Sequence, residues 1–363
     1  MKRRTVYSLS ILFLLSTVLT TIGCGNKAIA TPYVAEEFVV CNAGGNQIFP
    51  SISGNIVVWT DYRNEDEDLF DNGDIYGYNL NNGVELPICT EDSYQGSLDI
   101  DGDIVVWTDG RNDYSDTSNS DIYGYNLSTE SEFIICNEPD SQGAPSISGD
   151  TVVWMEYRAD TDYVTYIYGC HLSAGEVFPV STYQSMKMFP SVYGDLVTWL
   201  DFRKVDFSTL HQQPQPVLNT EIYGCNLSSL LEFAITDDEI MQDLPSADIY
   251  GDTMVWSECN EGLCVIYSYN LTTQTKTALT TSHDAMGTPV IYGNVVVWSD
   301  YRNDNGDIYG YNLETGEEFA ICTDPGQQQN PAIYENIVVW EDDRNELPNT
   351  YDIYGARLTF DNP

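Results

Sequence analysis

The sequence predicts an all-β protein, a seven-bladed β-propeller whose N-terminal strand completes the last blade. Three observations support this prediction. Seven tryptophans recur at intervals of 42 to 57 residues, each repeat holds short strand segments, and the last repeat lacks a strand that the N-terminal region supplies. The tryptophans, one for each repeat, are Trp59, Trp107, Trp154, Trp199, Trp256, Trp298 and Trp340.

Each complete repeat divides into four strands separated by turns rich in Gly, Asn and Asp. In the first repeat, strand A covers residues 50–53 and ends at Gly54-Asn55, a two-residue turn signal. Strand B is the Val-Val-Trp run that continues through Arg63, and strand C is an Ile-Tyr-Gly-Tyr-Asn-Leu segment. Strand D has the form of residues 318–322, Glu-Phe-Ala-Ile-Cys. Four short strands in about 40 to 50 residues are typical of one propeller blade.

The two ends of the chain predict that the ring closes on itself. The last repeat stops after strand C, at residues 358–360, without a strand D. Residues 37–41, Glu-Phe-Val-Val-Cys, match the strand D segment 318–322. We therefore expect residues 37–41 to pair with the last blade, which removes an exposed sheet edge.

Side chains alternate along a strand, so one face of strand B carries a tryptophan, an acid two residues later and usually an arginine four residues later. We expect the arginine to pair with the acid that opens strand C, such as Asp74, in an Asp–Arg–Asp network between neighbouring blades. The fifth repeat lacks both charges, with Asn260 and Val265, and the third has Tyr166 at the acidic position. Besides the tryptophans, the structural residues of this motif are Asp61, Asp109, Asp300, Asp342, Arg63, Arg111, Arg158, Arg203, Arg302 and Arg344.

The repeat, Val-Val-Trp-x-Asp-x-Arg-Asn followed by Asp-Ile-Tyr-Gly-Tyr-Asn-Leu, resembles the TolB-like propeller repeats. It is also similar to the propeller repeats of surface proteins from methanogenic archaea. The resemblance covers residues 36–360 and implies a propeller outside the cytoplasm that contacts proteins or the cell envelope. It supplies no catalytic residue.

The charge balance excludes one large class of function. The 363 residues contain 56 Asp and Glu but 14 Lys and Arg, so the formal net charge is -42. Such a chain lacks the basic surface that binding to nucleic acid or an anionic membrane requires. The charge suits divalent cations, basic partners or a salty environment, and equally a soluble surface kept apart by self-repulsion.

The first thirty residues predict export. Residues 2–4 are basic, residues 6–22 are apolar, and residues 28–30 offer a small-x-small cleavage site. Alternatively, residues 21–24 form a loose lipobox in which Cys24 carries a lipid. We expect a secreted or cell-surface protein, with lipid anchoring through Cys24 as the alternative to free secretion, a signal peptide over 1–30 and a propeller over 36–360. No other stretch has the roughly 20 apolar residues of a membrane span.

The cysteines predict one disulfide. Cys259 and Cys264 flank a four-residue turn between two strands, where a cross-hairpin disulfide fits. Four others occupy one equivalent position in four repeats, too far apart to bridge, and are expected to be small buried residues: Cys41, Cys89, Cys136 and Cys322.

The connections between strands D and A hold a second repeated residue, a glutamine. Because these connections emerge on one face of a propeller, the amides could ring the channel mouth and bind a glycan or a peptide terminus. They could equally satisfy backbone groups of their own loops. The glutamines are Gln47, Gln95, Gln142, Gln242 and Gln328. His211 lies in an insertion, residues 204–220, which is a further candidate for partner recognition.

Acidic turns between strands B and C are weak calcium candidates. Dense oxygen ligands around a turn suit a hard cation, although no turn has the full spacing of an EF-hand. The candidate ligands are Asp66, Asp68, Asp304 and Asp307. No other cofactor is expected.

The sequence favours binding over catalysis. His171, His211 and His283 lie in three different repeats, and no nucleophile, zinc or phosphate-loop motif is present. We expect a monomeric propeller that binds an envelope protein or glycan as a non-catalytic module. The alternatives are a structural component of the envelope and, since carboxylate pairs abound, an enzyme acting on polysaccharides, a lyase or hydrolase.

Overall fold

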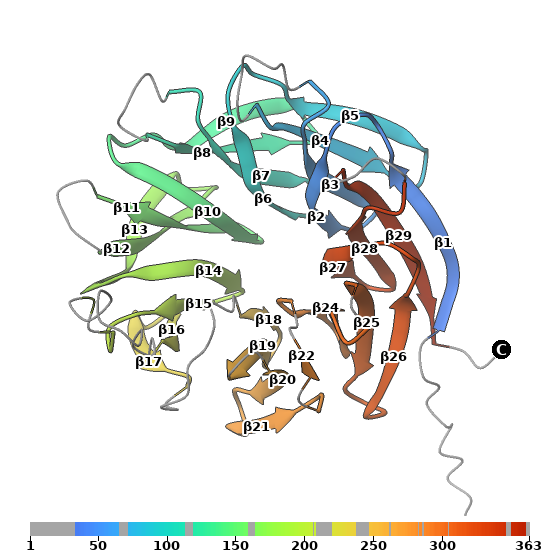
Figure 1. Ribbon diagram of the computed structural model, residues 1–363. Helices are drawn as coiled ribbons and strands as arrows, with labels where there is room; N and C mark the ends of the chain where they lie inside the picture. Colours follow the sequence, from blue (N-terminus) through green and yellow to red (C-terminus); the bar gives the residue numbers. More distant parts are fainter. Residues whose placement is uncertain are drawn as a thin grey trace, which may run out of the picture.

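The computed structural model describes residues 33–64, 72–112, 119–158, 164–205, 207, 220–236, 247–260, 263–281, 283–284, 287–303, 305–345 and 350–360. The elements assigned within them are β-strands in seven sheets that stand around a central axis (Figure 1). The predicted seven-bladed propeller is therefore confirmed. No helix in these ranges is long and apolar enough to cross a membrane.

The first three blades each contain four antiparallel strands in chain order. Blade one comprises β2 (Gln47–Ser53), β3 (Ile56–Asp61), β4 (Asp74–Asn79) and β5 (Val84–Cys89). Blade two comprises β6 (Gln95–Asp101), β7 (Ile104–Asp109), β8 (Asp121–Asn126) and β9 (Ser131–Cys136). Blade three comprises β10 (Ser141–Ser148), β11 (Thr151–Tyr157), β12 (Thr165–His171) and β13 (Glu176–Ser185).

Blades four to six follow the same order. Blade four comprises β14 (Lys187–Tyr193), β15 (Leu196–Asp201), β16 (Glu221–Asn226) and β17 (Leu231–Ala234). Blade five comprises β18 (Asp248–Tyr250), β19 (Thr253–Asn260), β20 (Leu263–Asn270) and β21 (Thr275–Ala278), and the short β22 (His283–Asp284) also pairs with β20. Blade six comprises β23 (Val290–Tyr292), β24 (Val295–Asp300), β25 (Asp307–Asn312) and β26 (Glu317–Cys322).

Blade seven is built from both ends of the chain, as the sequence predicts. Its strands are β27 (Gln328–Tyr334), β28 (Ile337–Asp342), β29 (Asp352–Thr359) and, outermost, β1 (Tyr33–Cys41). Figure 1 shows β1 and β29, the blue and red ends of the colour scale, side by side. They are antiparallel, with Glu37 opposite Ala356, and β1 begins four residues before the predicted segment. The pairing covers the edge of β29 and closes the ring.

In each blade, a tight turn connects the innermost strand to the second strand of the same blade. In blade one, Ser53 pairs with Ile56, so Gly54 and Asn55 form the whole turn. Gly54 has a φ of 58°, a left-handed conformation that glycine adopts without steric cost and that this kind of hairpin requires. The same strand carries a bulge before Ser51, where Phe49 has a φ of 53°. Corresponding residues with positive φ recur in four other blades: Ser97, Ala144, Phe189 and Asn330.

The hydrophobic core lies between blades, in seven clusters. Alternation along strand B divides its side chains between the two neighbours. In blade one, Val57 and Trp59 pack against blade seven, whereas Val58 packs against blade two. The seven tryptophans are all almost completely buried, and each one contributes to the cluster shared with the preceding blade.

The arginine motif lies within each blade, so the predicted Asp–Arg–Asp network between blades is wrong. In blade one, Arg63 donates to both oxygens of Asp61 at 2.9 and 2.7 Å and to Glu85 on strand D at 2.7 Å. Its guanidinium crosses the ring of Tyr76, 4.2 Å from the centroid. Asp74 instead accepts the amide of Asn64 at 2.8 Å. The prediction failed because a long arginine reaches across strand C to strand D, and the shorter asparagine occupies the nearer acid.

Neighbouring blades are joined through the equivalent cysteines instead. Arg63 also donates to Cys41 of blade seven at 3.2 Å, and Arg111 donates to Cys89 of blade one at 3.1 Å. Burial raises the pKa of Cys41 to about 11. The thiols are therefore protonated near neutral pH and act as buried packing groups. The described free cysteines are all buried, and Cys259 and Cys264 form the predicted disulfide.

Blades three and five vary the motif. In blade five, Lys276 of strand D takes the place of the usual glutamate and contacts Glu258 at 2.6 Å, which restores the cation that the missing arginine would supply. In blade three, Val177 stands at the strand D position, and Arg158 bonds to Glu156 and to the hydroxyl of Tyr168, each at 2.8 Å.

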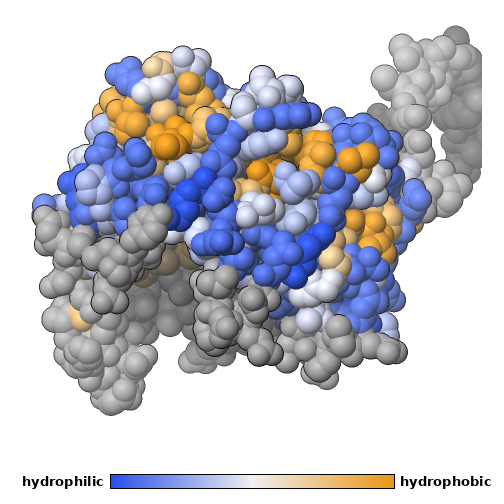
Figure 2. Space-filling view, turned by 90° about the horizontal axis from the view of Figure 1, so that it is seen from above, coloured by the Kyte–Doolittle hydropathy of each residue, from blue (hydrophilic) through white to orange (hydrophobic). Residues whose placement is uncertain are grey.

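The outer side of the ring is mostly hydrophilic, with separate hydrophobic patches (Figure 2). Exposed apolar side chains occur on the outermost strands; Leu231, for example, is 68% exposed on β17. The charged motif residues lie behind this surface. The ring therefore offers two distinct regions, a mostly hydrophilic exterior and the channel formed by its innermost strands.

Candidate functional site

The candidate site is the central channel, whose wall is the innermost strand of each blade. On each of these strands an Ile or Val points between blades, and the residues on either side of it face the channel. Two layers result. The carboxylate layer is formed by Ser51, Asp99, Ser146, Ser191, Asp248, Val290 and Ala332, and the mouth layer by Ser53, Asp101, Ser148, Tyr193, Tyr250, Tyr292 and Tyr334.

Asp99 is tied into the wall of the channel by four donors. Its Oδ1 accepts the backbone N–H of Ile100 at 2.8 Å and the hydroxyl of Ser51 at 3.3 Å, and its Oδ2 accepts the N–H of Ile147 at 2.9 Å. Ser146 donates a further bond. Burial nevertheless outweighs these bonds and raises the pKa of Asp99 to about 6.

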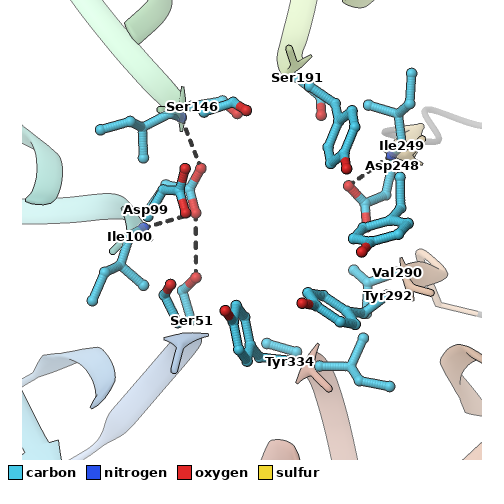
Figure 3. Close-up of a pocket in the computed structure, with 18 of the residues that line it drawn as sticks. Ser51, Asp99, Ile100, Ser146, Ser191, Asp248, Ile249, Val290, Tyr292 and Tyr334 are labelled. Carbon is cyan, nitrogen blue, oxygen red and sulfur yellow. Dashed lines mark hydrogen bonds between the residues drawn. The ribbon is translucent and has the colours of Figure 1, made fainter. Parts of the chain in front are cut away.

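Asp248 lies on the opposite side of the channel with fewer donors (Figure 3). It accepts the backbone N–H groups of Ile249 and Ile291, both at 2.8 Å. Its pKa is also raised to about 6, mainly by burial and further by the negative charge of Asp99. The negative charge of Asp99 thus adds a smaller contribution to the effect of burial on Asp248.

The mouth layer is divided into an aromatic half and a polar half. The rings of Tyr193, Tyr250, Tyr292 and Tyr334 form a continuous arc, with successive centroids 5.1, 4.6 and 4.6 Å apart. Burial and hydrogen bonds to Tyr334 and Tyr250 raise the pKa of Tyr292, so its hydroxyl stays protonated near neutral pH. Blades four to seven therefore supply an uninterrupted aromatic wall.

The polar half comes from blades one to three. Ser53 accepts the N–H of Gly102 at 3.0 Å, Asp101 accepts that of Gly149 at 2.6 Å, and Ser148 accepts that of Gly194 at 3.1 Å. Each side chain thus bonds to the next blade and also faces the channel. The same groups hold the ring together and give one half of the mouth its hydrogen-bonding character.

Two cavities lie along the channel. The two layers line a cavity of about 250 Å³ at the end where strands A and B connect. A second cavity of about 550 Å³ lies at the opposite end, where the bulges place Phe49 and Phe189 with 52% and 38% of their surface exposed. Neither cavity has a Lys, Arg or His among the described residues that line it.

The predicted glutamine ring does not line either cavity. The side chains of Gln47, Gln95, Gln142 and Gln328 are fully buried. Gln47 donates to the carbonyls of Gly44 and Gly45, both at 3.2 Å, so it ties its own loop together, the second of the two roles considered. Gln242 and His211 lie outside the described residues, as does Cys24.

Calcium binding at the acidic turns stays a prediction. Asp307 is buried, and its Oδ2 accepts the amide of Asn303 at 2.9 Å. Asp66, Asp68 and Asp304 lie outside the described residues. One trio of acidic and thiol groups converges in the described ranges, Glu37, Cys322 and Asp324, but Arg344 bonds to all three and so occupies the centre of that cluster.

Sequence reasoning missed both channel layers, although their signal is present in the repeat. Aligned on the tryptophan, the strand A triplets read Ser-Ile-Ser, Asp-Ile-Asp, Ser-Ile-Ser, Ser-Val-Tyr, Asp-Ile-Tyr, Val-Ile-Tyr and Ala-Ile-Tyr. The middle position is constant in character because it fills the space between blades. The flanking positions vary, and that variation within a regular repeat marks the residues that are free to differ for function.

No protein-family model matches this sequence, and no curated protein matches it. Solved structures share its fold. The oligogalacturonate lyase solved in complex with manganese has a TM-score of 0.61 and 15% identity, over 92% of this chain and 98% of that one. The propeller domain of the Trilobed protease from Pyrococcus furiosus has a TM-score of 0.65 and 13% identity, over 88% and 94% of the two chains.

TolB from Acinetobacter baumannii is also similar, with a TM-score of 0.52 and 13% identity, over 73% of this chain and 63% of that one. The propeller fold is thus shared with TolB, while the similarity of the repeat to TolB-like proteins and to surface proteins of methanogens stays a prediction. At such identities the comparisons establish the fold alone. The Trilobed protease propeller is described as having an open velcro topology, whereas β1 closes the ring here.

Proposed function

We propose that this protein is an exported, non-catalytic binding module that receives part of an envelope protein or glycan in its central channel. The observation that carries the proposal is the divided mouth layer, with four tyrosines facing serines and an aspartate around a cavity of about 250 Å³. Aromatic faces beside a few placed polar groups are typical of ligand-binding sites. The basic and apolar start of the sequence supports export.

Two features favour binding over the polysaccharide lyase or hydrolase alternative. The side chains of the two channel layers are hydroxyls, carboxylates, tyrosines and aliphatic groups, each of which belongs to the repeated inner strand. An oligogalacturonate, the substrate class named for one structural neighbour, is a polyanion. Carboxylates without a neighbouring cation would repel it.

The test uses the mature chain to capture partners from the native envelope. Ser53→Tyr with Ser148→Tyr would fill the polar half of the mouth with side chains that four other blades already accommodate there. Ser131→Tyr on the exposed strand β9 is the control. We expect one partner to be captured by the wild type and the control but lost from the filled variant.

Equal capture by the filled variant, or turnover of a polysaccharide by the wild type, would overturn the proposal. The mass of the mature N-terminus provides a separate test of export. Cleavage in the region of residues 28–30 indicates secretion, a lipid on Cys24 indicates anchoring, and an intact N-terminus contradicts both.

A further inference from the structure

The channel contains negative charge that nothing in the described chain balances. Asp99, Asp101 and Asp248 face a cavity whose described lining holds no Lys, Arg or His. The motif carboxylates behind the surface are different, since the buried Asp61 carries its own arginine at 2.7 Å. Taking an ionised carboxylate out of water is costly unless a cation accompanies it. A cationic ligand would remove that cost on binding.

Asp248 is the carboxylate best able to accept another donor. Its two described donors are backbone N–H groups, one to each oxygen, and the adjacent residues of its layer include Val290, which offers no hydroxyl. A carboxylate oxygen has two lone pairs, so each oxygen of Asp248 keeps one for a ligand. Asp99, with four donors, contributes mainly its charge.

The tyrosine arc suits the same ligand. The arc lies two residues further along the strands than the carboxylate layer, about 7 Å at 3.3 to 3.4 Å for each residue. Cations are attracted to aromatic faces, and methylene groups pack against them. The four-carbon stem of a lysine could therefore pass along Tyr250 and Tyr292 while its ammonium reaches Asp248.

A divalent metal fits the channel less well. Calcium takes six to eight oxygen ligands at about 2.3 to 2.6 Å. The three channel carboxylates do not converge on one point, since the described chain has one such trio and it lies elsewhere, at Glu37, Cys322 and Asp324. The wall near Asp248 otherwise offers one serine hydroxyl, that of Ser191, beside tyrosine rings and aliphatic groups, which suits an organic cation rather than a bare ion.

We propose that the channel recognises an alkylammonium group, the lysine side chain of a basic partner protein, which enters past the tyrosine arc and bonds to Asp248 opposite Asp99. This inference rests on the proposed binding function and names the chemistry of its ligand. The net charge of -42 would draw a basic partner toward the ring.

The test compares two probes of nearly equal shape, N-acetyl-lysine methylamide and N-acetyl-norleucine methylamide, by ligand-observed NMR and calorimetry on the intact mature protein. We expect the lysine probe to bind and the norleucine probe not to bind. Asp248→Asn should weaken the lysine probe about tenfold, because a hydrogen bond to a charged group is lost. Tyr292→Leu should weaken it severalfold through loss of the aromatic face.

Asp252→Asn is the matched control. Asp252 is exposed at the turn after β18 and bonds to Thr272 at 2.8 Å, so the variant changes the net charge equally outside the channel. Binding should change by less than about twofold, since exposed charges are largely screened. The wild-type comparison of the two probes needs no variant, so the proposal stays testable even if a channel substitution impairs folding.

Acidification provides a second readout. Binding of the lysine probe should weaken as pH falls from about 7 to about 5, because Asp99 and Asp248 become protonated. The other titratable groups that face them are Asp101 and the four tyrosines of the mouth layer. Burial raises the pKa of Tyr193 and of Tyr292, so these two hydroxyls stay protonated over this range.

Equal binding of the two probes, or unchanged binding after Asp99→Asn with Asp248→Asn, would overturn the inference. If stoichiometric calcium displaces the lysine probe from the wild type, and calcium no longer binds to the double variant, the site would be reassigned to a divalent cation. A third outcome separates the two proposals. If the Ser53→Tyr, Ser148→Tyr protein loses the partner but the Asp99→Asn, Asp248→Asn protein still binds it, the proposed binding function stands and only the lysine chemistry is refuted.

Discussion

Blade five suggests how the charged motif can be tested in blade six. In blade six, Arg302 donates to the two oxygens of Asp300 at 2.8 and 2.5 Å and to Glu318 at 2.7 Å. Burial alone would raise the pKa of Asp300, but bonds from Arg302 and Trp298 hold it below its ordinary value. The perturbation is Arg302→Asn, which places in blade six the residue that blade five has at this position.

The expected loss follows from the burial of Asp300. Its side chain is completely buried, so removing the arginine leaves an ionised carboxylate with the indole of Trp298 and one backbone N–H. Breaking a buried pair costs about 3 to 5 kcal/mol. The guanidinium is 22% exposed, which lowers the figure, and its contact with the ring of Tyr309 adds about 0.5 to 1 kcal/mol. We expect a loss of about 3 kcal/mol.

Blade five also provides the rescue. There the acid is the longer Glu258, and Lys276 on strand D supplies the cation. The corresponding full set in blade six is Asp300→Glu, Arg302→Asn and Glu318→Lys, since position 318 has the same register as Lys276. This triple variant should lie within about 1 kcal/mol of the wild type, because the buried carboxylate regains a partner.

Urea unfolding followed by tryptophan fluorescence measures both effects, provided that the m-value is unchanged. Arg357→Gln is the control, since Arg357 forms no described ion pair and stacks at 5.7 Å from the ring of Phe38. It should cost less than about 1 kcal/mol. A similarly small loss in Arg302→Asn, or a triple variant no more stable than that single variant, would refute the assignment of the motif as a buried charge pair.

Three further predictions concern closure, pH and the disulfide. Deleting residues 33–41 exposes the edge of β29, so size-exclusion chromatography should show self-association that the intact mature chain lacks. Because the folded-state pKa of Asp248, about 6, lies above its unfolded value, the stability that the wild type has relative to Asp248→Asn should fall by about 2 kcal/mol as pH rises from about 4 to about 6; a constant difference in urea unfolding would contradict this. Replacing Cys259 and Cys264 by Ala should cost about 2 kcal/mol in the same assay, as expected for a loop this short, and no loss would show that the disulfide constrains little.

The strand pattern was predictable because its causes are local. Gly54-Asn55 fixes a tight turn, and the alternating Val57, Val58 and Trp59 fix which side chains enter each inter-blade core. The match between residues 37–41 and strand D likewise predicted the closing strand, since equivalent repeats need equivalent partners. Only the bounds differed, because backbone pairing between β1 and β29 extends beyond the matching residues.

The arginine network was predicted with the wrong partners. Sequence spacing showed that Asp61 and Arg63 share a face, but it could not show that the arginine crosses Tyr76 to reach Glu85. Which of two acids a long side chain reaches depends on the width and twist of the assembled sheet. The lysine of blade five was overlooked for the same reason, since Lys276 compensates for a residue on a strand that is not its immediate neighbour.

The sequence by itself determined the number of blades, the order of their strands and the closure of the ring, because each of these depends on a pattern repeated along the chain. The tertiary structure alone decided which residues meet at the axis. Asp99 and Asp248 belong to blades two and five, with two blades between them in the chain, yet the curvature of the ring places them across one channel. It likewise brings four tyrosines from four blades into one arc. Their proximity results from the angle between successive blades, which no local sequence pattern encodes.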